Sequence, residues 1–357
     1  MENKHYIIPI FVSHEGCPHN CIFCDQTIIT GNKQEVDVNF VRRTIENHLK
    51  TIKRSTSKVE VSFFGGTFTA IPIDKQRELL KVAKEYKDKR DIDYIRLSTR
   101  PDYIDSCILD NLKEYSVDII ELGIQSLDRE VLFKSGRGHS KEDVKRASYL
   151  IKKYGFVLGH QIMVGLPCDT FEKDIETVKN SISMKPDIYR IYPALVIKGT
   201  VMEDMYKRKQ YKPYELSEAV DICKILYCIL RANKIKVIRI GLQPTENINL
   251  GKDVIAGPFH PAFRELVEGR IYNHIIEENI PLSYKGEITI GINNRDLSKL
   301  YANKKEYFNH MKEKFIHCSI KVVQDFLMNR ETLNIIGGNF NEYIELDDYI
   351  INNYKNF

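Results

Sequence analysis

The chain has 357 residues, of which 43% are hydrophobic, so it can bury one large core or two unequal ones. Lysine and arginine number 53 against 49 aspartate and glutamate, and the net charge of +4 permits a nucleic-acid partner without requiring one. Residues 1–16 lack the apolar run and the cleavage site of a signal peptide, and no stretch reads as a membrane span, so we expect a cytoplasmic location.

Strand-like and helix-like segments alternate between residue 5 and about residue 242. The helical segments repeat apolar residues at intervals of three and four, as Leu79, Val82, Ala83 and Tyr86 do. The predicted strands are Tyr6–Val12, Val59–Phe64, Tyr94–Ser98, Val117–Ile124, Phe156–Val164 and Asp187–Tyr192, with a late one at Lys236–Ile240. The other predicted helices are Val36–Lys53, Asp105–Tyr115, Asp128–Lys134, Ser140–Tyr154, Thr170–Met184 and one around Cys223, with Ser140 as an N-cap.

This alternation predicts parallel βα units, because a helix is the usual crossover between parallel strands. About six units can be counted, which favours an α/β fold, a partial TIM-type (β/α)6 barrel over residues 1–243, rather than a full eight-unit barrel. In such barrels the chemistry takes place at the carboxyl ends of the strands. Residues that directly follow a strand are therefore the first candidates for a site.

The pattern changes after Gln243–Asp253, which reads as a linker. Pro258–Glu278 is mainly helical, and the next segments read as strand, helix, helix and strand, at Glu287–Gly291, Arg295–Tyr301, Glu306–Phe315 and Ser319–Gln324. We predict a small C-terminal α/β extension over residues 254–330. The Asn- and Tyr-rich residues 331–357 are expected to form a loose tail.

Three of the eight cysteines, Cys17, Cys21 and Cys24, directly follow the first strand. Their C-x3-C-x2-C spacing lets three thiolates bind three irons of a cubane and leaves the fourth iron without a protein ligand. The alternative is a structural zinc site completed by His14 or His19. The βα pattern behind the segment counts against zinc.

Several residues at later strand ends are candidates for ligand contacts. Gly65, Gly66 and Thr67 follow the second strand, where glycines let a ligand approach the backbone. The other candidates are Gln125 and Ser126 after the fourth strand, Gly165 after the fifth, and His139 and His160 as acid–base groups. Ser126 reads equally well as a capping residue, and either histidine as structural. Glu121 needs a partner inside the barrel, and Arg100 is one candidate.

The cysteine spacing, with Phe23 before the last cysteine, resembles the radical S-adenosylmethionine (SAM) superfamily. In that family SAM chelates the open iron, and one electron breaks its S–C5′ bond to give a 5′-deoxyadenosyl radical. The resemblance implies a [4Fe–4S] cluster, bound SAM with contacts at the Gly-Gly turn, and an external one-electron reductant.

Further stretches resemble the radical SAM half of the catalytic subunit of Elongator, which modifies the wobble uridine of tRNA. They occur in the same order, at 65–68 (GGTF), 100–103 (RPDY), 121–126 (ELGIQS), 137–140 (RGHS), 165–167 (GLP) and 191–200 (IYPALVIKGT). The chain departs in its shorter spacing between the first two cysteines, and no acetyltransferase domain is expected. The resemblance implies an enzyme with a tRNA substrate. The alternatives are a small-molecule radical SAM enzyme of the coproporphyrinogen-oxidase type and a non-catalytic, metal-stabilised RNA-binding protein.

Two segments bear on an RNA partner. Tyr206–Tyr214 interleaves tyrosines with Lys207, Arg208 and Lys209, which suits base stacking and phosphate contacts, although a solvated loop with packed tyrosines would look the same. Glu287–Gln324 resembles the core of a KH RNA-binding module, and its GxxG turn would fall at 302–305, where the glycines are absent. Lys304 and Lys305 could meet phosphates there. The alternative is an accessory domain without RNA contacts.

Overall fold

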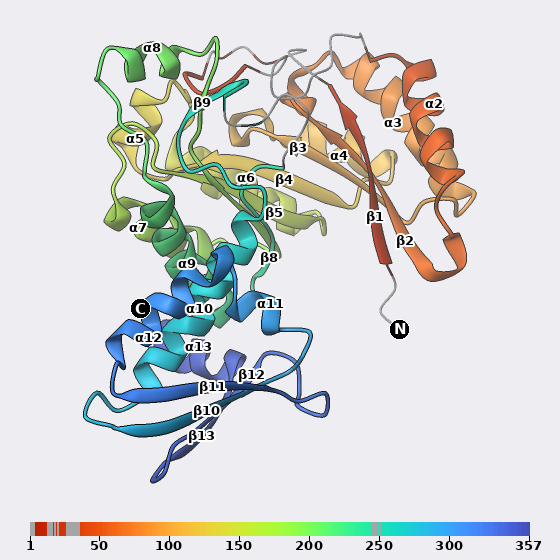
Figure 1. Cartoon of the computed structure of the whole chain (residues 1–357). Helices are drawn as coiled ribbons and strands as arrows, with labels where there is room; N and C mark the ends of the chain where they lie inside the picture. Colours follow the sequence, from red (N-terminus) through yellow and green to blue (C-terminus); the bar gives the residue numbers. More distant parts are fainter. Residues whose placement is uncertain are drawn as a thin grey trace.

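Seven strands form one parallel sheet that curls into a half-barrel (Figure 1). The computed structural model describes residues 4–12, 17, 19, 21–25, 36–243, 249 and 251–357. In sheet order the strands are β1 (Lys4–Phe11), β2 (Ser57–Phe64), β3 (Tyr94–Thr99), β4 (Ile119–Gln125), β5 (Val157–Val164), β6 (Ile188–Pro193) and β8 (Lys236–Ile240). The predicted partial barrel is confirmed, with the late strand as its seventh member.

Helices cover the outer face of the sheet. They are α2 (Val38–Leu49), α3 (Ile73–Asp88), α4 (Ser106–Glu114), α5 (Arg129–Lys134), α6 (Lys141–Lys153), α7 (Phe171–Ile182) and α9 (Leu216–Ala232), with the short α8 (Val201–Lys207) near the carboxyl ends of the strands. None of the helices in the described part of the chain combines the length and the apolar run that crossing a bilayer takes.

The strands alternate in character although parallel strands are usually apolar on both faces. Ile8, Val61 and Leu97 are buried toward the helices, whereas Glu60 and Arg96 are buried on the concave side. Successive side chains of a strand point to opposite faces of the sheet. The inside of the half-barrel is therefore polar, as a binding site requires and a simple core does not.

Polar caps fix where most barrel helices begin. The side chains of Asp105, Asp128, Thr170 and Thr200 each accept a hydrogen bond from a backbone N–H in the first turn of the following helix. Ser140 does the same and forms a capping box with Asp143, so this prediction is confirmed. Such caps keep the connections after the strands short and well defined.

A smaller unit follows the barrel, on the side away from the carboxyl ends of the strands (Figure 1). The chain first returns through β9 (Val254–Ala256), which pairs with β7 (Val196–Ile197), and then enters α10 (Phe263–Asn279). Of the predicted linker, residues 244–248 and 250 lie outside the described residues. The predicted strand–helix–helix–strand pattern is present as β10 (Gly286–Ile292), α11 (Leu297–Leu300), α12 (Glu306–Lys314) and β11 (Cys318–Gln324).

Residues 331–357 are ordered and belong to this smaller unit, so the expectation of a loose tail does not hold. They form β12 (Thr332–Ile336), β13 (Asn341–Glu345) and α13 (Leu346–Tyr354). The sheet order is β11-β10-β12-β13, and α13 packs against α9 of the barrel. The side chains of Leu346, Ile350 and Tyr354, spaced by four, are buried. The Asn-rich composition hides this apolar stripe.

We expect Ile350→Ala to lower the free energy of unfolding by about 2–4 kcal/mol, because the side chain is 0% exposed and its removal leaves a cavity between α13 and its neighbours. Asn352→Ala, on the exposed side of the same helix, should change it by less than about 0.5 kcal/mol. Urea denaturation followed by circular dichroism measures both. Equal, negligible effects would show that α13 does not contribute to the core.

Candidate active site at the carboxyl ends of the strands

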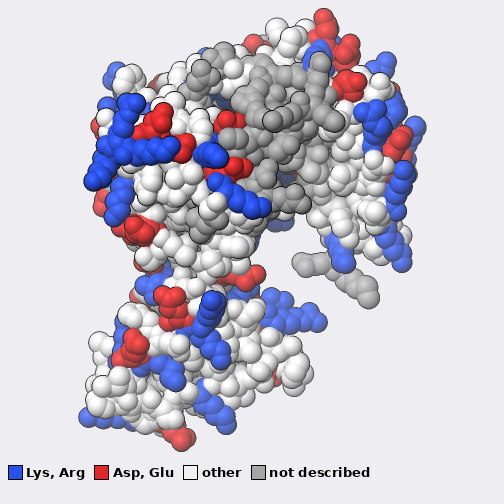
Figure 2. All heavy atoms as spheres, turned by 45° about the horizontal axis from the view of Figure 1, so that its top comes forward, with Lys and Arg blue, Asp and Glu red and all other residues white. Residues whose placement is uncertain are grey.

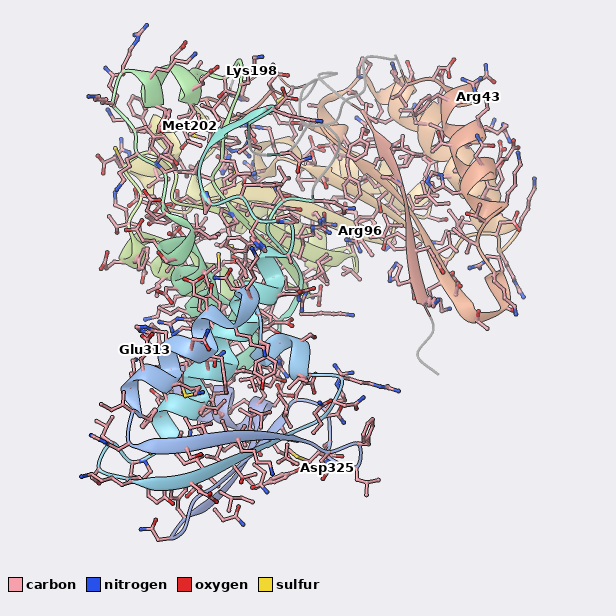
Figure 3. All side chains as sticks on the ribbon, viewed as in Figure 1. Arg43, Arg96, Lys198, Met202, Glu313 and Asp325 are labelled. Carbon is pink, nitrogen blue, oxygen red and sulfur yellow. The ribbon has the colours of Figure 1, made fainter. Side chains whose placement is uncertain are left out.

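The cysteine segment is fastened to the barrel around Ile22. Its N–H donates to the carbonyl of Ser135 (3.2 Å), and its carbonyl accepts from the N–H of Met202 (2.9 Å). Phe23 packs against two apolar clusters, formed by Val131, Leu166 and Ala194 and by Val196, Met202 and Tyr211. Met202 belongs to α8, and Figure 3 shows it near the ends of the strands. Phe23 is therefore an anchor for the segment that carries the cysteines.

The three cysteines differ in exposure. Cys21 is only 7% exposed, and Cys17 and Cys24 are partly exposed. The structure describes all eight cysteines of the chain, and none of them is in a disulfide. Because a cubane takes each thiolate on a different iron, the three sulfurs need not converge on one point.

The zinc alternative finds no support in the geometry. Within the described ranges, no three His, Cys, Asp or Glu side chains converge as one metal ion requires. The ring of His19 instead faces Asp102, with 3.6 Å between Nε2 and Oδ2. It also packs so closely on Gly138 that a Cβ there would lie 2.6 Å from the ring. His14 lies outside the described residues.

Two buried arginines hold Cys21. Nη1 of Arg137 donates to the Cys21 sulfur (3.3 Å), and Nη1 of Arg100 lies 4.0 Å from it. Nη2 of Arg137 also donates to the carbonyl of Gly123 (2.5 Å), at the end of β4. Arg100 donates to the carbonyl of Arg137 and forms a two-pronged ion pair with Asp102. Three stretches that are distant in sequence thus meet at one thiol.

The charge balance of this region fits an anionic group at Cys21. Burial lowers the pKa of Arg137, and the Cys21 thiol opposes that effect. Nε of Arg137 is buried and has no hydrogen-bond partner among the described residues, and a buried, uncompensated cation is costly. Three thiolates bound to iron would supply the missing negative charge. Sequence reasoning missed this role of Arg100 and Arg137, although both begin stretches, RPDY and RGHS, that carry the Elongator resemblance.

The predicted Gly-Gly turn adjoins the end of β1, after which the cysteine segment follows in the sequence. Gly65 has a φ of 103°, which favours glycine, and a Cβ there would lie 3.5 Å from the backbone of Val12. The N–H of Val12 donates to the carbonyl of Phe64 (2.7 Å), so the ends of β1 and β2 are locked together. Gly66 is partly exposed, and Thr67 is buried at the start of the next short helix. The two glycines of the turn thus present backbone without side chains beside Val12, at the end of β1.

Gln125 and His139 leave polar atoms unsatisfied near the end of β4. Oε1 of Gln125 and Nδ1 of His139 are buried and find no hydrogen-bond partner within the described ranges. Nε2 of His139 bonds with the carbonyl of Ile124 (3.1 Å). Burial and then the charge of Arg137 lower the pKa of His139 to about 3, so the ring is neutral at neutral pH. Two orphaned polar atoms beside the cysteine segment fit a bound polar ligand.

Three predicted candidates have structural partners. Ser126 shares its hydroxyl with Thr177 (3.3 Å) and accepts from the N–H of Asp128 (3.1 Å), as a capping residue does. Gly165 makes room for Tyr214, whose ring would lie 2.6 Å from a Cβ at that position. His160 is enclosed by the hydroxyls of Ser148 and Ser181 on the helix side of β5.

Inside the barrel, Glu121 does not pair with Arg100. Its Oε1 accepts from Arg96 (2.7 Å), which Figure 3 labels, and from Arg190 (2.9 Å). Arg100 lies beyond the end of β3 and turns toward Cys21 instead. The expected need for a partner is met, but by different residues.

The basic segments predicted for RNA lie on different parts of the molecule. Lys207 ends α8 and pairs with Glu203 (2.8 Å), and Arg208 and Lys209 follow it. Figure 2 shows basic side chains on the side of the barrel that carries α5 and α8. Lys304 and Lys305 belong to the smaller unit, and together with Asn303 they have φ values of 51–70°, which glycine would favour. The tyrosine of the first segment that is most open to stacking is Tyr206.

Beside the site, a pocket of about 450 Å³ is lined by Gly165, Asp169, Tyr211 and Tyr214, among others. Burial raises the pKa of Asp169 to about 6, and it raises the pKa of Asp174 well above its usual value, with the Asp169 charge adding to the effect. The hydroxyl of Tyr214 donates to Asp174 (3.2 Å). The two carboxyl groups therefore retain a proton between them under mildly acidic conditions.

This pair should make stability fall as pH rises. An acid with a raised pKa in the fold contributes most below its unfolded pKa, near 4, and its contribution is lost as pH passes the folded value. We expect the free energy of unfolding of the parent, relative to Asp174→Asn, to decrease by on the order of 2 kcal/mol between pH 4 and pH 7. The exposed Asp204→Asn serves as the control. A difference independent of pH would contradict the shared proton.

Known proteins resemble this chain over its barrel. The tRNA uridine(34) acetyltransferase of Methanocaldococcus infernus is 28% identical in an alignment of 255 residues that covers 60% of this chain and 48% of that protein. Elongator complex protein 3 of Saccharomyces cerevisiae is 31% identical in an alignment of 194 residues that covers 49% of this chain and 35% of that protein. The chain thus spans about half the length, or less, of these relatives.

A solved structure shares the fold. The Elp3 of Methanocaldococcus infernus, with residues 1–46 deleted, superposes with a TM-score of 0.61 at 21% identity, over 98% of this chain and 76% of that one. The model of the radical SAM superfamily matches residues 11–180, and the model of the radical SAM C-terminal domain matches residues 186–273. The chain therefore belongs to the radical SAM superfamily of enzymes, which use a [4Fe–4S] cluster and S-adenosylmethionine.

Proposed function

We propose that this enzyme holds its cluster through Cys17, Cys21 and Cys24, cleaves SAM reductively with an electron from an external reductant, and modifies an RNA of the tRNA uridine type. One observation carries the proposal: the three-cysteine segment lies against two buried arginines at the carboxyl ends of parallel strands. When bound, the cluster supplies the electron that cleaves SAM and so provides a radical that abstracts hydrogen from the substrate.

The protein groups around the cluster have two tasks. Arg137 and Arg100 offset the negative charge that thiolates bring to Cys21. Ile22 and Phe23 fix the segment between α5 and α8, so that the sulfurs have a fixed place relative to the strands. Hydrogen bonds to a ligating sulfur also tune the reduction potential of an iron–sulfur cluster.

SAM would bind next to this segment. Gly65 and Gly66 are partly exposed and would offer their backbone, with the buried Thr67 behind them, and Gln125 and His139 offer polar atoms without a partner among the described residues. Ser126 and Gly165 would act indirectly. Ser126 would fix the turn after β4, and Gly165 would fix the position of Tyr214. His139 is neutral and serves as a hydrogen-bonding group and not as a charged one.

The RNA part of the proposal rests on the relatives and on the basic surface. The names of the relatives specify a tRNA uridine and the Elongator complex. In this chain, Lys207, Arg208 and Lys209 lie near the ends of the strands, where a substrate phosphate would meet them. Lys304 and Lys305 would add contacts on the smaller unit, at the turn that resembles the GxxG turn of KH modules.

Cluster binding is tested by anaerobic reconstitution. The parent should bind about four irons per chain and release 5′-deoxyadenosine from SAM with dithionite. Cys17→Ala, Cys21→Ala and Cys24→Ala should each abolish this release, whereas Cys107→Ala, at an exposed position on α4, should leave it intact. Iron analysis and chromatography measure the two quantities. Colourless protein loaded with zinc would contradict the proposal.

The RNA substrate is tested in cells. A strain lacking the gene should lose one modified uridine, seen by mass spectrometry of tRNA and rRNA nucleosides. A plasmid with Cys107→Ala should restore it, and one with Cys21→Ala should not. An unchanged nucleoside profile, together with active SAM cleavage in vitro, would favour a small-molecule substrate.

A further inference from the structure

A row of buried charges, the ion ladder, crosses the concave face of the half-barrel. It comprises the buried Glu60 on β2, Arg96 on β3 and Glu121 on β4, and Arg190 on β6, whose side chain is 12% exposed. Nη2 of Arg96 donates to Glu60 (2.8 Å), and its Nη1 donates to Glu121 (2.7 Å). Each charge in the ladder thus has an opposite charge as its neighbour.

The ladder continues across β5 because a glycine, Gly159, lies opposite Glu121 on that strand. A Cβ at Gly159 would lie 2.7 Å from Cγ of Glu121. Without it, Glu121 reaches past β5 and accepts from Nε of Arg190 (2.9 Å). Arg190 is further fixed by Tyr192, whose hydroxyl accepts from Nη1 (3.2 Å), and by the ring of Phe64 (5.3 Å).

The alternation of negative and positive charges along the ion ladder ends at β8. Arg239 on β8 is the direct cross-strand neighbour of Arg190, so two guanidinium groups lie side by side. Nε of Arg239 donates to the carbonyl of Gly241 (3.3 Å), and in the described part of the chain no acid pairs with it. Nearby Arg264 is already paired with Glu268 (2.8 Å).

Burial makes this excess charge costly. Desolvation and the charges of Arg190 and Arg264 lower the pKa of Arg239, and Tyr192 only partly opposes them. The guanidinium nevertheless stays charged at neutral pH, because its ordinary pKa is above 12. Among the described residues of the ladder and its β8 neighbour, three arginines, Arg96, Arg190 and Arg239, face two carboxylates, Glu60 and Glu121. Within this set one positive charge is left over at the β8 end.

The position of Arg239 on an end strand of the sheet also favours contact with a substrate. β1 and β8 are the two end strands of the sheet, so the half-barrel is open between them. Figure 2 shows the surface hollowed between the β1–β2 side of the barrel and the smaller unit. Arg239, which pairs with no acid of the described residues, therefore borders the open side, where a substrate can reach it. The planar guanidinium matches a phosphate with two parallel hydrogen bonds.

We propose that Arg239, supported by Arg190, binds a phosphodiester group of the RNA next to the target nucleotide, inside the half-barrel. This inference rests on the proposed RNA substrate and names a binding residue that the barrel itself provides. The bound phosphate would restore the alternation of charges along the ion ladder.

The first test compares RNA binding across salt. The probe is a synthetic RNA stem–loop with a uridine in its single-stranded loop, and fluorescence anisotropy gives the dissociation constant. Arg239→Gln should weaken binding about tenfold and reduce the slope of log K against log salt by about 0.7–1. Lys236→Gln removes the same charge at an exposed position of the same strand and should change neither quantity. Arg239→Lys should keep the slope.

The second test identifies which phosphate of the RNA loop contacts Arg239. Each linkage of the loop is replaced in turn by a neutral methylphosphonate. In the parent, one replacement next to the uridine should weaken binding, and in Arg239→Gln that same replacement should have no further effect. Urea denaturation verifies that Arg239→Gln is folded.

The outcomes separate the inference from the proposed function. If the parent binds the RNA but Arg239→Gln shows an unchanged slope, or if every neutral linkage acts equally in both proteins, the inference is wrong and the proposed function stands. If the parent does not bind the RNA and a deletion strain retains all modified uridines, the proposed function itself fails.

Discussion

The contact between the Arg137 guanidinium and the Cys21 sulfur holds the site together. It joins a segment after β1 to the connection after β4, with Arg100 from the end of β3 as a second support. A buried guanidinium can be stable there only if its charge is compensated, so the positions of the strand ends and of the cysteine segment depend on each other. The site is consequently built by long-range electrostatics as much as by the cysteine motif.

Charges inside the half-barrel are also compensated by opposite charges. Its strands bury apolar side chains toward the helices and charged ones toward the opening, and the ion ladder neutralises most of these charges in pairs. Replacing such a ladder by apolar residues would often cost little stability. Its presence is therefore better explained by the substrate that the interior receives than by the stability of the fold.

Much of the barrel could be predicted from the sequence, because helical and strand periodicities are local. The cysteine motif and the Ser140 cap were visible for the same reason. The contact of Arg137 with Cys21 was not, since 116 residues separate them, and the partner of Glu121 was misassigned because sequence does not reveal that Arg100 turns away at the end of β3. Residues 331–357 were misjudged because asparagines surround the few apolar residues that α13 buries.

The packing of α13 on α9 links the last part of the chain to the barrel. Arg231 at the end of α9 binds both Glu331 and Asp347, so this seam is polar at its rim and apolar within. During synthesis, the outer side of α9 emerges from the ribosome more than a hundred residues before the helix that shields it. The apolar face of α9 that α13 covers is therefore exposed on the nascent chain for roughly several seconds, until α13 has been synthesised. A chaperone can bind this face during that time.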